Sequence, residues 1–143
     1  MNEAFNIGYT TGVFDLFHIG HLNLLRKAKQ YCNTLIVGVT IDELVSYKHK
    51  KAVIPFEERI EIVSSIKYVD LAVPQYSMNK IDAWEKHKFN IMFVGSDWKN
   101  TKKWNQYEKQ FETIGVKIKY FEYTKGTSST LINESLKKLR NDK

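Results

Sequence analysis

Cysteine, proline and long apolar runs are all scarce in this sequence of 143 residues. The single cysteine, Cys32, gives no intrachain disulfide and has no partner at zinc-finger spacing. With 2 prolines and 43% hydrophobic residues, the chain is neither disordered nor fibrous. No apolar run is long enough to cross a bilayer, and residues 1–6 lack the basic and apolar regions of a secretory signal. We therefore expect a cytoplasmic protein with no membrane insertion.

Length and charge narrow the class of protein. A chain of this length is expected to form one domain, so residues 1–143 should share a single core. The net charge of +6 favours anionic ligands in general, such as nucleotides, sugar phosphates, nucleic acid or a membrane surface. Charge alone does not choose among these ligands, and most of the lysines are expected to form a solvated face.

The hydrophobic pattern alternates between strands and helices along the chain. Strands are predicted at 7–13, 34–40, 68–73, 91–95 and 116–121, and helices at 21–31, 42–47, 55–66, 80–87, 102–113 and 128–139. Pro74 is expected to end the third strand, and the last helix is expected to turn Ile132, Leu136 and Leu139 inward. An aromatic stripe in the helix at 102–113, continuing to Ile114, is expected to pack in the core. This alternation predicts an α/β fold, a Rossmann-like parallel sheet of about five strands with helices on both faces.

The most informative stretch runs from Thr10 to His21 and reads TTGVFDLFHIGH. It places His18 and His21 at a strand-to-helix turn, bracketed by Gly12 and Gly20. A helix that starts there offers free N–H groups and a positive dipole end to an anion, so the two imidazoles are well placed to meet phosphate oxygens. The structural alternative for a single histidine is a helix cap. A metal pair would lack further ligands at the usual spacing.

Other polar residues also follow predicted strands. Asp42 follows the second strand, Gly95-Ser96-Asp97-Trp98 follows the fourth, and residues 124–130 follow the fifth. In such sheets, ligands bind beyond the carboxyl ends of the strands, at the point where the strand order reverses. This convergence predicts a single ligand site, independently of any family.

Four blocks of sequence resemble the short bacterial glycerol-3-phosphate cytidylyltransferases, a group within the nucleotidyltransferases that carry a His-x-Gly-His motif. The blocks are residues 12–21, the basic loop 48–51 leading through 56–59 to 66–70, residues 94–98, and residues 124–130. The resemblance covers nearly the whole chain. Two positions depart from the family pattern, because Lys67 and Tyr123 stand where the family has arginines associated with phosphate handling. Lys67 keeps the charge but loses the planar fork of arginine, and Tyr123 loses the charge.

The resemblance implies cytidylyl transfer from CTP to a phosphorylated small alcohol, with glycerol 3-phosphate as the first choice of acceptor. The products would be a CDP-alcohol and pyrophosphate, formed by direct in-line attack. A phosphomonoester is already ionised near pH 7, with a second pKa of about 6, so no general base or covalent nucleophile is required. Mg²⁺ is expected with CTP, without a metal site built from protein ligands alone. The same resemblance implies a homodimer.

The resemblance also implies roles for individual residues. The expected catalytic residues are His18, His21, Lys48 and Arg59. Nucleotide contacts are expected from Gly12, Val13, Phe14, Lys50, Asp97, Trp98, Thr124, Gly126, Thr127, Ser128, Ser129 and Thr130. Acceptor contacts are expected from Asp15, Asp42, Lys67 and Tyr123, although Asp15 is better suited to fixing the histidine turn. Helix capping is the structural alternative for the two serines.

Two alternatives remain open. The first is a related enzyme that uses ATP, or one whose acceptor is choline phosphate, ethanolamine phosphate or another polyol phosphate. The second is a nucleic-acid-binding module, favoured by the positive charge and the 13% aromatic residues. Because the lysines are scattered and the aromatic residues lie at core spacing, no nucleic-acid partner is expected.

Overall fold

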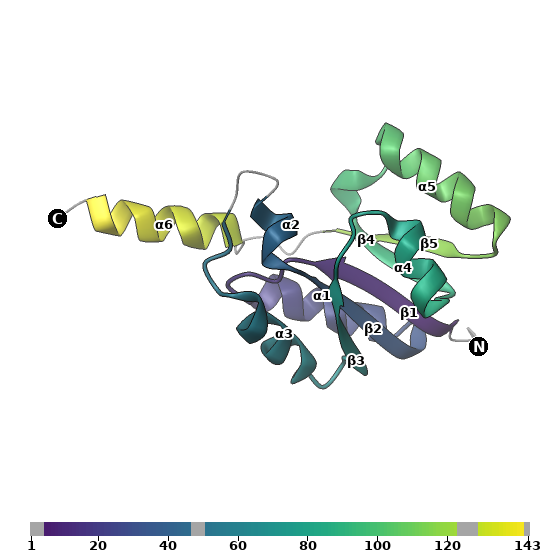
Figure 1. The fold of residues 1–143 in the computed structure, drawn as a ribbon, viewed down its shortest axis with the longest axis horizontal. Helices are drawn as coiled ribbons and strands as arrows, with labels where there is room; N and C mark the ends of the chain where they lie inside the picture. The colour runs from purple at the N-terminus through teal and green to yellow at the C-terminus, as the bar shows by residue number, and fades with distance from the viewer. Residues whose placement is uncertain (1–4, 47–50, 123–128, 142–143) are drawn as a thin grey trace.

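The computed structural model describes residues 5–46, 51–122 and 129–141. One parallel sheet contains β1 (Phe5–Gly12), β2 (Cys32–Thr40), β3 (Leu71–Gln75), β4 (Ile91–Gly95) and β5 (Lys117–Phe121). The strand order is β3-β2-β1-β4-β5, so the order reverses between β1 and β4 (Figure 1). The predicted Rossmann-like α/β fold is confirmed.

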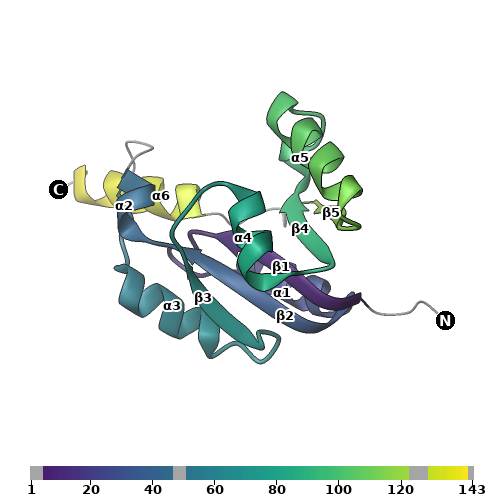
Figure 2. The same ribbon diagram turned by 45° about the vertical axis from the view of Figure 1, so that its right-hand side comes forward.

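Helices cover both faces of this sheet (Figure 2). The helices are α1 (Ile19–Lys29), α2 (Asp42–Ser46), α3 (Phe56–Ser64), α4 (Lys80–His87), α5 (Lys102–Thr113) and α6 (Ser129–Asn141), with a 3-10 turn, η1 (Ser96–Trp98), after β4. Residues of α1 and α3 share one core cluster, and residues of α4 and α5 share the other. The two clusters account for the two packed layers of the fold.

The central strand β2 shows why the sheet is buried on both sides. Leu35 and Val37 belong to the cluster under α1 and α3, whereas Ile36 between them belongs to the cluster under α4 and α5. Successive side chains of a strand point to opposite faces, so a strand covered on both faces must be apolar at every position. This requirement explains the continuous apolar run from which the strand was predicted.

The prediction that Pro74 ends the third strand is wrong. β3 continues to Gln75, and Pro74 pairs with Val39 of β2. β3 lies at an edge of the sheet, where a proline is tolerated because its missing N–H is not needed by a second neighbour. The longer strand brings Gln75 level with Thr40, at the carboxyl edge of the sheet.

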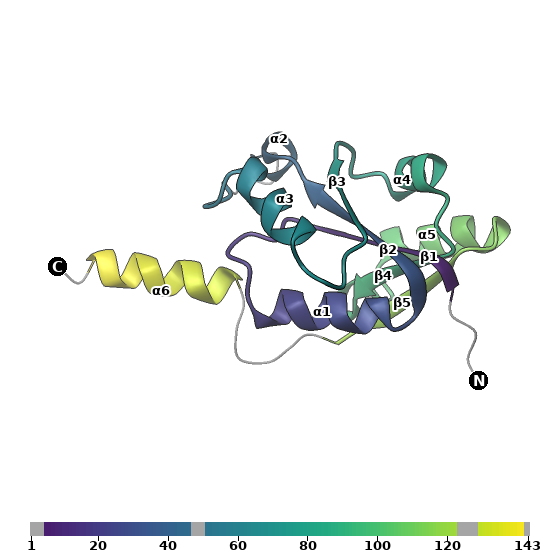
Figure 3. The same cartoon turned by 90° about the horizontal axis from the view of Figure 1, so that it is seen from below.

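The last helix, α6, projects away from the sheet (Figures 1 and 3). Leu131, Leu136 and Leu139 are 48%, 38% and 66% exposed, so the prediction that Leu136 and Leu139 point inward is wrong. The physical reason is that α1 with α3 and α4 with α5 already cover the two faces of the sheet. Ile114 is also exposed, because it lies beyond the end of α5 and its core stripe. Among the helices described, none is long and apolar enough to cross a membrane.

Candidate active site

The backbone pairing of β1 with β4 ends before the carboxyl ends of the two strands, at the point where the strand order reverses. Their backbone pairing is limited to Gly8 with Ile91 and Tyr9 with Met92, although the strands continue to Gly12 and Gly95. Ligand sites of parallel α/β sheets form at such a point. The segments that leave the two strands here are the histidine turn after β1 and η1 after β4.

The histidine turn, residues 13–18, has an unusual backbone. Phe14 and Leu16 have φ angles of 56° and 50°, in the left-handed region that non-glycine residues rarely adopt. Each such conformation costs on the order of 1–3 kcal/mol and persists only where surrounding contacts hold it. Phe14 supplies one anchor, because its side chain is buried in the core cluster under α1 and α3. The remaining anchors are polar.

His18 and His21 form a reciprocal cap at the start of α1. His18 Nδ1 accepts a hydrogen bond from the Gly20 N–H at 3.0 Å, and His21 Nδ1 accepts one from the His18 N–H at 3.2 Å. The centroids of the two rings are 4.0 Å apart. Because each Nδ1 accepts, a neutral ring must carry its proton on Nε2. The cap and a functional role are therefore compatible, since capping through Nδ1 leaves an Nε2–H donor on each ring.

Burial keeps both imidazoles uncharged near neutral pH. Burial lowers the pKa of His21 to about 4, with a further lowering by His18 and an opposing effect of Asp15. Burial also lowers the pKa of His18. The first turn of α1 itself contains no acidic residue, so the helix carries no carboxylate of its own at the positive end of its dipole. The turn thus combines neutral hydrogen-bond donors with a helix terminus that favours an anion.

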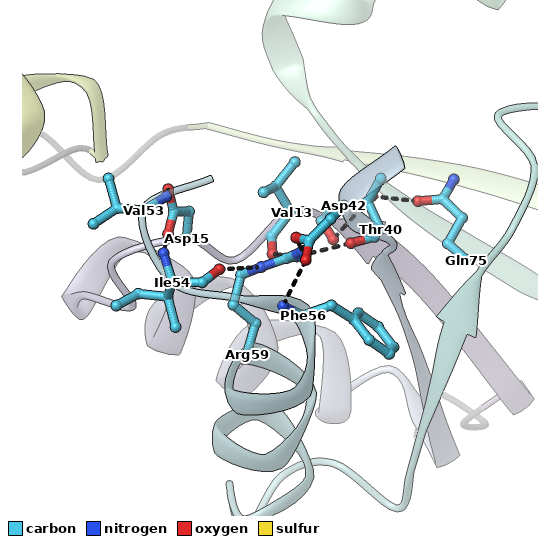
Figure 4. A network of polar contacts seen from close by, with 10 residues as sticks. Val13, Asp15, Thr40, Asp42, Val53, Ile54, Phe56, Arg59 and Gln75 are labelled. Carbon is cyan, nitrogen blue, oxygen red and sulfur yellow. Dashed lines mark hydrogen bonds and ion pairs between the residues drawn. The ribbon is translucent and has the colours of Figure 1, made fainter. Parts of the chain in front are cut away.

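Asp15 connects the histidine turn to the segment that follows the basic loop (Figure 4). Its two carboxylate oxygens accept hydrogen bonds from the backbone N–H groups of Val53 at 2.8 Å and Ile54 at 2.9 Å. The side chain is buried. These bonds give Asp15 a role in holding the turn, whereas a role in contacting the acceptor stays a prediction.

Arg59 is 1% exposed and donates hydrogen bonds to three backbone carbonyls and one carboxylate (Figure 4). The carbonyl oxygens belong to Ile54 at 2.9 Å, Val13 at 2.7 Å and Thr40 at 2.8 Å. The carboxylate is that of Asp42, at 2.5 Å. These bonds engage most of the five N–H groups of the guanidinium. These bonds give Arg59 a role in holding the turn, whereas a direct action of Arg59 on the substrate stays a prediction.

Asp42 connects α2 to the start of α3. Its second carboxylate oxygen accepts a hydrogen bond from the Phe56 N–H at 3.2 Å. Although desolvation acts to raise it, the pKa of Asp42 is lowered by the hydrogen bonds from Arg59 and the Phe56 N–H. Lys48 and Lys50 lie outside the described residues. The segments on either side of these lysines are connected to the histidine turn. Asp42 and Arg59 connect α2 to it, and Asp15 and Arg59 connect residues 53–54.

Most of the other predicted site residues follow β4 or β5, whereas Gly12, Val13 and Phe14 lead into the histidine turn. Asp97 and Trp98 form η1 after β4 and are exposed, at the carboxyl edge that also carries the histidine turn. The structure does not describe Tyr123, Thr124, Gly126, Thr127 and Ser128. Ser129 and Thr130 begin α6 without described side chains.

In the part of the chain that the structure describes, no group of three or more His, Cys, Asp or Glu residues could hold a metal ion.

Lys67 lies at the opposite edge of the sheet from the histidines. It stands between α3 and β3, next to Asp70, whose carboxylate accepts a hydrogen bond from the Leu35 N–H near the start of β2 at 2.8 Å. Lys67 is exposed, and its Nζ lies 5.2 Å from the centroid of the Tyr68 ring. Because α3 leads the chain from the carboxyl edge back to the amino edge, one chain does not bring Lys67 to its own histidine turn.

A polar cluster beneath the turn was not anticipated from the sequence. It consists of Thr11, Thr40 and Gln75, which lie at the carboxyl ends of β1, β2 and β3. Thr40 and Gln75 are buried, and Thr11 is half-buried. A signal was present, because Thr11 and Thr40 are hydroxyl residues that close two apolar strands. Gln75 carried none, because the predicted third strand ended before it.

Comparisons with known proteins point to one family. Residues 9–135 match the family model described as cytidylyltransferase-like. The chain is 35% identical to the glycerol-3-phosphate cytidylyltransferase of Staphylococcus aureus (strain NCTC 8325 / PS 47), over 89% of this chain and 92% of the relative. It is also 35% identical to the glycerol-3-phosphate cytidylyltransferase of Bacillus subtilis (strain 168), over 89% of this chain and 94% of the relative.

A solved structure has the same fold. The lipopolysaccharide core biosynthesis protein from Thermoplasma volcanium GSS1 superposes with a TM-score of 0.71 and 23% sequence identity. The match covers 87% of this chain and 100% of that chain. At this identity the likeness supports the architecture alone.

Proposed function

The chain belongs to the cytidylyltransferase-like family of nucleotidyltransferases, and we propose that it transfers a cytidylyl group from CTP to glycerol 3-phosphate. The acceptor is taken from the names of the two relatives, each of which aligns with 89% of this chain. The observation that carries the proposal is the reciprocal cap of His18 and His21. It leaves two neutral Nε2–H donors at the N-terminus of α1, beside the reversal of strand order.

The proposed reaction is a single in-line displacement. An ionised oxygen of the acceptor phosphate attacks the α-phosphorus of CTP, and the bond to the bridging oxygen of pyrophosphate breaks as that oxygen takes the electron pair. Because the acceptor phosphate loses its second proton at a pKa of about 6, no protein base is needed. His18 and His21 would donate their Nε2–H groups to oxygens of the α-phosphate as charge develops there. Catalysis would therefore consist of alignment and charge stabilisation.

The network around Arg59 supports this reaction by fixing the surroundings of the basic loop. Asp15 and Arg59 hold residues 53–54, and Arg59 with Asp42 holds α2, so both sides of the loop are tied to the histidine turn. We propose that Lys48 and Lys50 contact the triphosphate from this loop. CTP would enter as its Mg²⁺ complex, with the ion carried by triphosphate oxygens, because the carboxylates of Asp15 and Asp42 accept protein N–H donors.

The nucleoside and the outer phosphates are assigned to separate segments. Asp97 and Trp98 are proposed to contact cytidine, since η1 leaves β4 directly beside the strand that leads to the histidines. The residues proposed to contact the outer phosphates are Thr124, Gly126, Thr127, Ser128, Ser129 and Thr130. Support for that second assignment is that α6 begins at Ser129, because a helix start favours an anion.

We propose that the enzyme acts as a homodimer. The exposed leucines of α6 form an apolar surface that a partner would cover, and a contribution of Lys67 to a phosphate site requires a second copy. Mixing His18→Ala chains with Lys67→Ala chains tests both points. If each site combines residues from two copies, hybrid dimers regain activity that neither variant has alone. Full activity of Lys67→Ala, or a monomer by light scattering, would contradict the proposal.

Pyrophosphate release measures the proposed function directly. Each of the four ribonucleoside triphosphates is combined with glycerol 3-phosphate, choline phosphate, ethanolamine phosphate and other polyol phosphates. We expect release with CTP and glycerol 3-phosphate, and formation of CDP-glycerol. Faster release with ATP would contradict the nucleotide assignment, and faster release with another acceptor would contradict the acceptor. Absence of release with every pair would exclude the function.

A further inference from the structure

Gln75 joins the carboxyl ends of three neighbouring strands. It is the last residue of β3 and is 5% exposed. Its Oε1 accepts hydrogen bonds from the hydroxyl of Thr11 on β1 and from the hydroxyl of Thr40 on β2, the latter at 2.6 Å. Figure 4 shows the amide of Gln75 next to Thr40, on the far side of Thr40 from Arg59. A single buried amide therefore adds side-chain bonds to the sheet at the edge that carries the histidine turn.

The contact with Ser77 fixes the orientation of this amide. Gln75 Nε2 lies 3.1 Å from the backbone oxygen of Ser77, which only accepts hydrogen bonds. The amide nitrogen must therefore face Ser77, and the amide oxygen must face Thr11 and Thr40. Both hydroxyls then act as donors to one acceptor. The amide is suited to this place because it donates on one side and accepts on the other, which neither a carboxylate nor an apolar side chain does.

Thr40 transmits this arrangement to the end of β1. Its hydroxyl oxygen lies 3.2 Å from the carbonyl oxygen of Gly12 as well as close to Gln75, so its single proton is held between two acceptors. The carbonyl of Thr40 accepts from Arg59, which also donates to the carbonyl of Val13. Two consecutive carbonyls at the end of β1 are thus contacted: Thr40 lies against that of Gly12, and Arg59 donates to that of Val13.

The residue that follows these two carbonyls is Phe14, where the left-handed backbone begins. A strained backbone keeps its conformation only when its surroundings determine it. The polar contacts at Gly12 and Val13 are part of those surroundings, on the strand side of the turn. Movement of Thr40 would therefore be passed to the turn, and through the turn to His18 and His21.

We propose that Gln75 is a positioning residue for the histidine turn, acting through Thr40 and Gly12 rather than on the substrate. The kinetic consequence rests on the proposed nucleotidyl transfer, whereas the placement of the histidines does not. Removing the amide deprives the buried hydroxyl of Thr40 and the half-buried hydroxyl of Thr11 of their common acceptor, so the end of β2 and the exit of β1 shift relative to each other. Small displacements of catalytic groups lower the rate strongly, and a shift of about 1 Å costs on the order of 10²-fold.

The test compares Gln75→Met and Gln75→Glu in the full chain. Methionine keeps the length of the side chain but removes both hydrogen-bonding functions, whereas glutamate still accepts from both threonines. The readouts are the imidazole ¹H–¹⁵N NMR signals of His18 and His21 without substrate, and kcat and KM for CTP. We expect Gln75→Met to shift both sets of signals and to lower kcat by roughly 10-fold to 100-fold, with KM changed much less. Gln75→Glu should have smaller effects on both readouts.

Gln106→Met is the matched control, because Gln106 is exposed on α5 and its substitution is the same chemical change at a place away from the turn. It should leave the histidine signals and kcat unchanged. A folded Gln75→Met protein with wild-type histidine signals would overturn the proposal. If that variant does not fold, Thr40→Val removes one donor from the same amide, and Thr40→Ser should restore the signals; unchanged signals in Thr40→Val would likewise overturn it. Should the wild-type protein release no pyrophosphate, the proposed function fails, and the histidine signals still decide the role of Gln75.

Discussion

His21 Nδ1 accepts a hydrogen bond from the backbone N–H of His18, so the second histidine of the motif fixes the backbone of the first. His18 in turn caps α1 through its own Nδ1. The spacing of the two histidines is therefore the spacing of a helix cap, which fixes both tautomers. The same interaction that begins the helix prepares two Nε2–H donors for an anion, and the following predictions separate these two contributions.

Substituting His18 by asparagine separates capping from chemistry. Asparagine caps helices well, so His18→Asn should keep the stability of α1, whereas His18→Ala should cost about 1 kcal/mol of the free energy of unfolding. Both variants lose the Nε2–H donor, and kcat should fall by roughly 10²–10³-fold in each. Urea unfolding and steady-state pyrophosphate release measure the two effects. Wild-type turnover in the stable asparagine variant would leave His18 with a capping role only.

The buried state of His21 makes the stability of the protein depend on pH. The pKa of His21 is lowered from its ordinary value to about 4, so the unfolded chain binds a proton below pH 6.5 while the folded chain does not. The contribution of His21 to stability is complete above pH 6.5 and is lost as the pH falls toward 4. The free energy of unfolding should decrease by roughly 2–3 kcal/mol between pH 7.5 and 4.5.

His21→Gln provides the control for this titration. The variant has no titrating group at position 21, so the decrease in its free energy of unfolding over the same interval should be smaller by the contribution of His21. The pKa values of His18 and His87 are also lowered by burial, and their contributions remain in the variant. The pKa values of the carboxylates Asp42 and Asp70 are lowered from 3.8, so most of the loss of their contribution to stability falls below this window. Equal pH dependence of wild type and His21→Gln would show that His21 is not the group responsible.

Arg59→Lys tests whether Arg59 acts on the structure or on the substrate. A lysine ammonium keeps the charge but does not reproduce the planar fork that reaches Val13, Thr40 and Asp42 together. With buried acceptors left unpaired, the free energy of unfolding should drop by roughly 2–4 kcal/mol. Arg26→Lys is the matched control. Arg26 donates to the side chains of Asn23 and Tyr68 in a partly exposed setting, so the substitution should change stability by less than about 0.5 kcal/mol.

Two outcomes of this substitution distinguish a structural role of Arg59 from the direct action on the substrate that the sequence predicted. If Arg59→Lys keeps the wild-type free energy of unfolding while kcat falls, the guanidinium acts on the substrate. If stability and kcat fall together, and substrate binding partly restores stability, Arg59 positions the turn and the basic loop. Thermal denaturation with and without CTP distinguishes the two outcomes.

Much of the fold followed from the sequence, because periodicity reports which faces are buried. β2 and β4 were placed well, since strands covered on both faces must be apolar throughout. Pro74 and the leucines of α6 were misjudged for the opposite reason. Edge pairing and the absence of a facing layer depend on strand order, which is not encoded in the local pattern around either segment.

The site shows the same division. The histidines and η1 were located because they follow strands, and a parallel sheet gathers such segments at one edge. Asp15 was expected to fix the turn, and Arg59 was predicted as a catalytic residue. Gln75 and Thr40 were not located, because they are separated from the turn along the chain and meet it only in three dimensions. Lys67 shows the opposite error. It lies in the block 66–70 that resembles the family, but this position does not bring it near the histidines of its own chain.

Asp97→Asn tests how the nucleotide base is chosen. Cytosine presents an exocyclic amino group that donates hydrogen bonds, and a carboxylate is the side chain that accepts from it, whereas uracil presents a carbonyl oxygen at the same position. Asp97 lies on η1, at the edge of the sheet that carries His18 and His21. Replacing the carboxylate by an amide should lower the ratio of kcat/KM for CTP to that for UTP by roughly 10-fold to 100-fold, which corresponds to one lost base contact.

Trp98→Ala is the companion variant. A stacking side chain supports every base, so its loss should weaken the binding of CTP and of UTP alike. If Asp97→Asn instead lowers kcat/KM equally for both nucleotides, the carboxylate holds η1 in place, and the choice of CTP must lie in another part of the site.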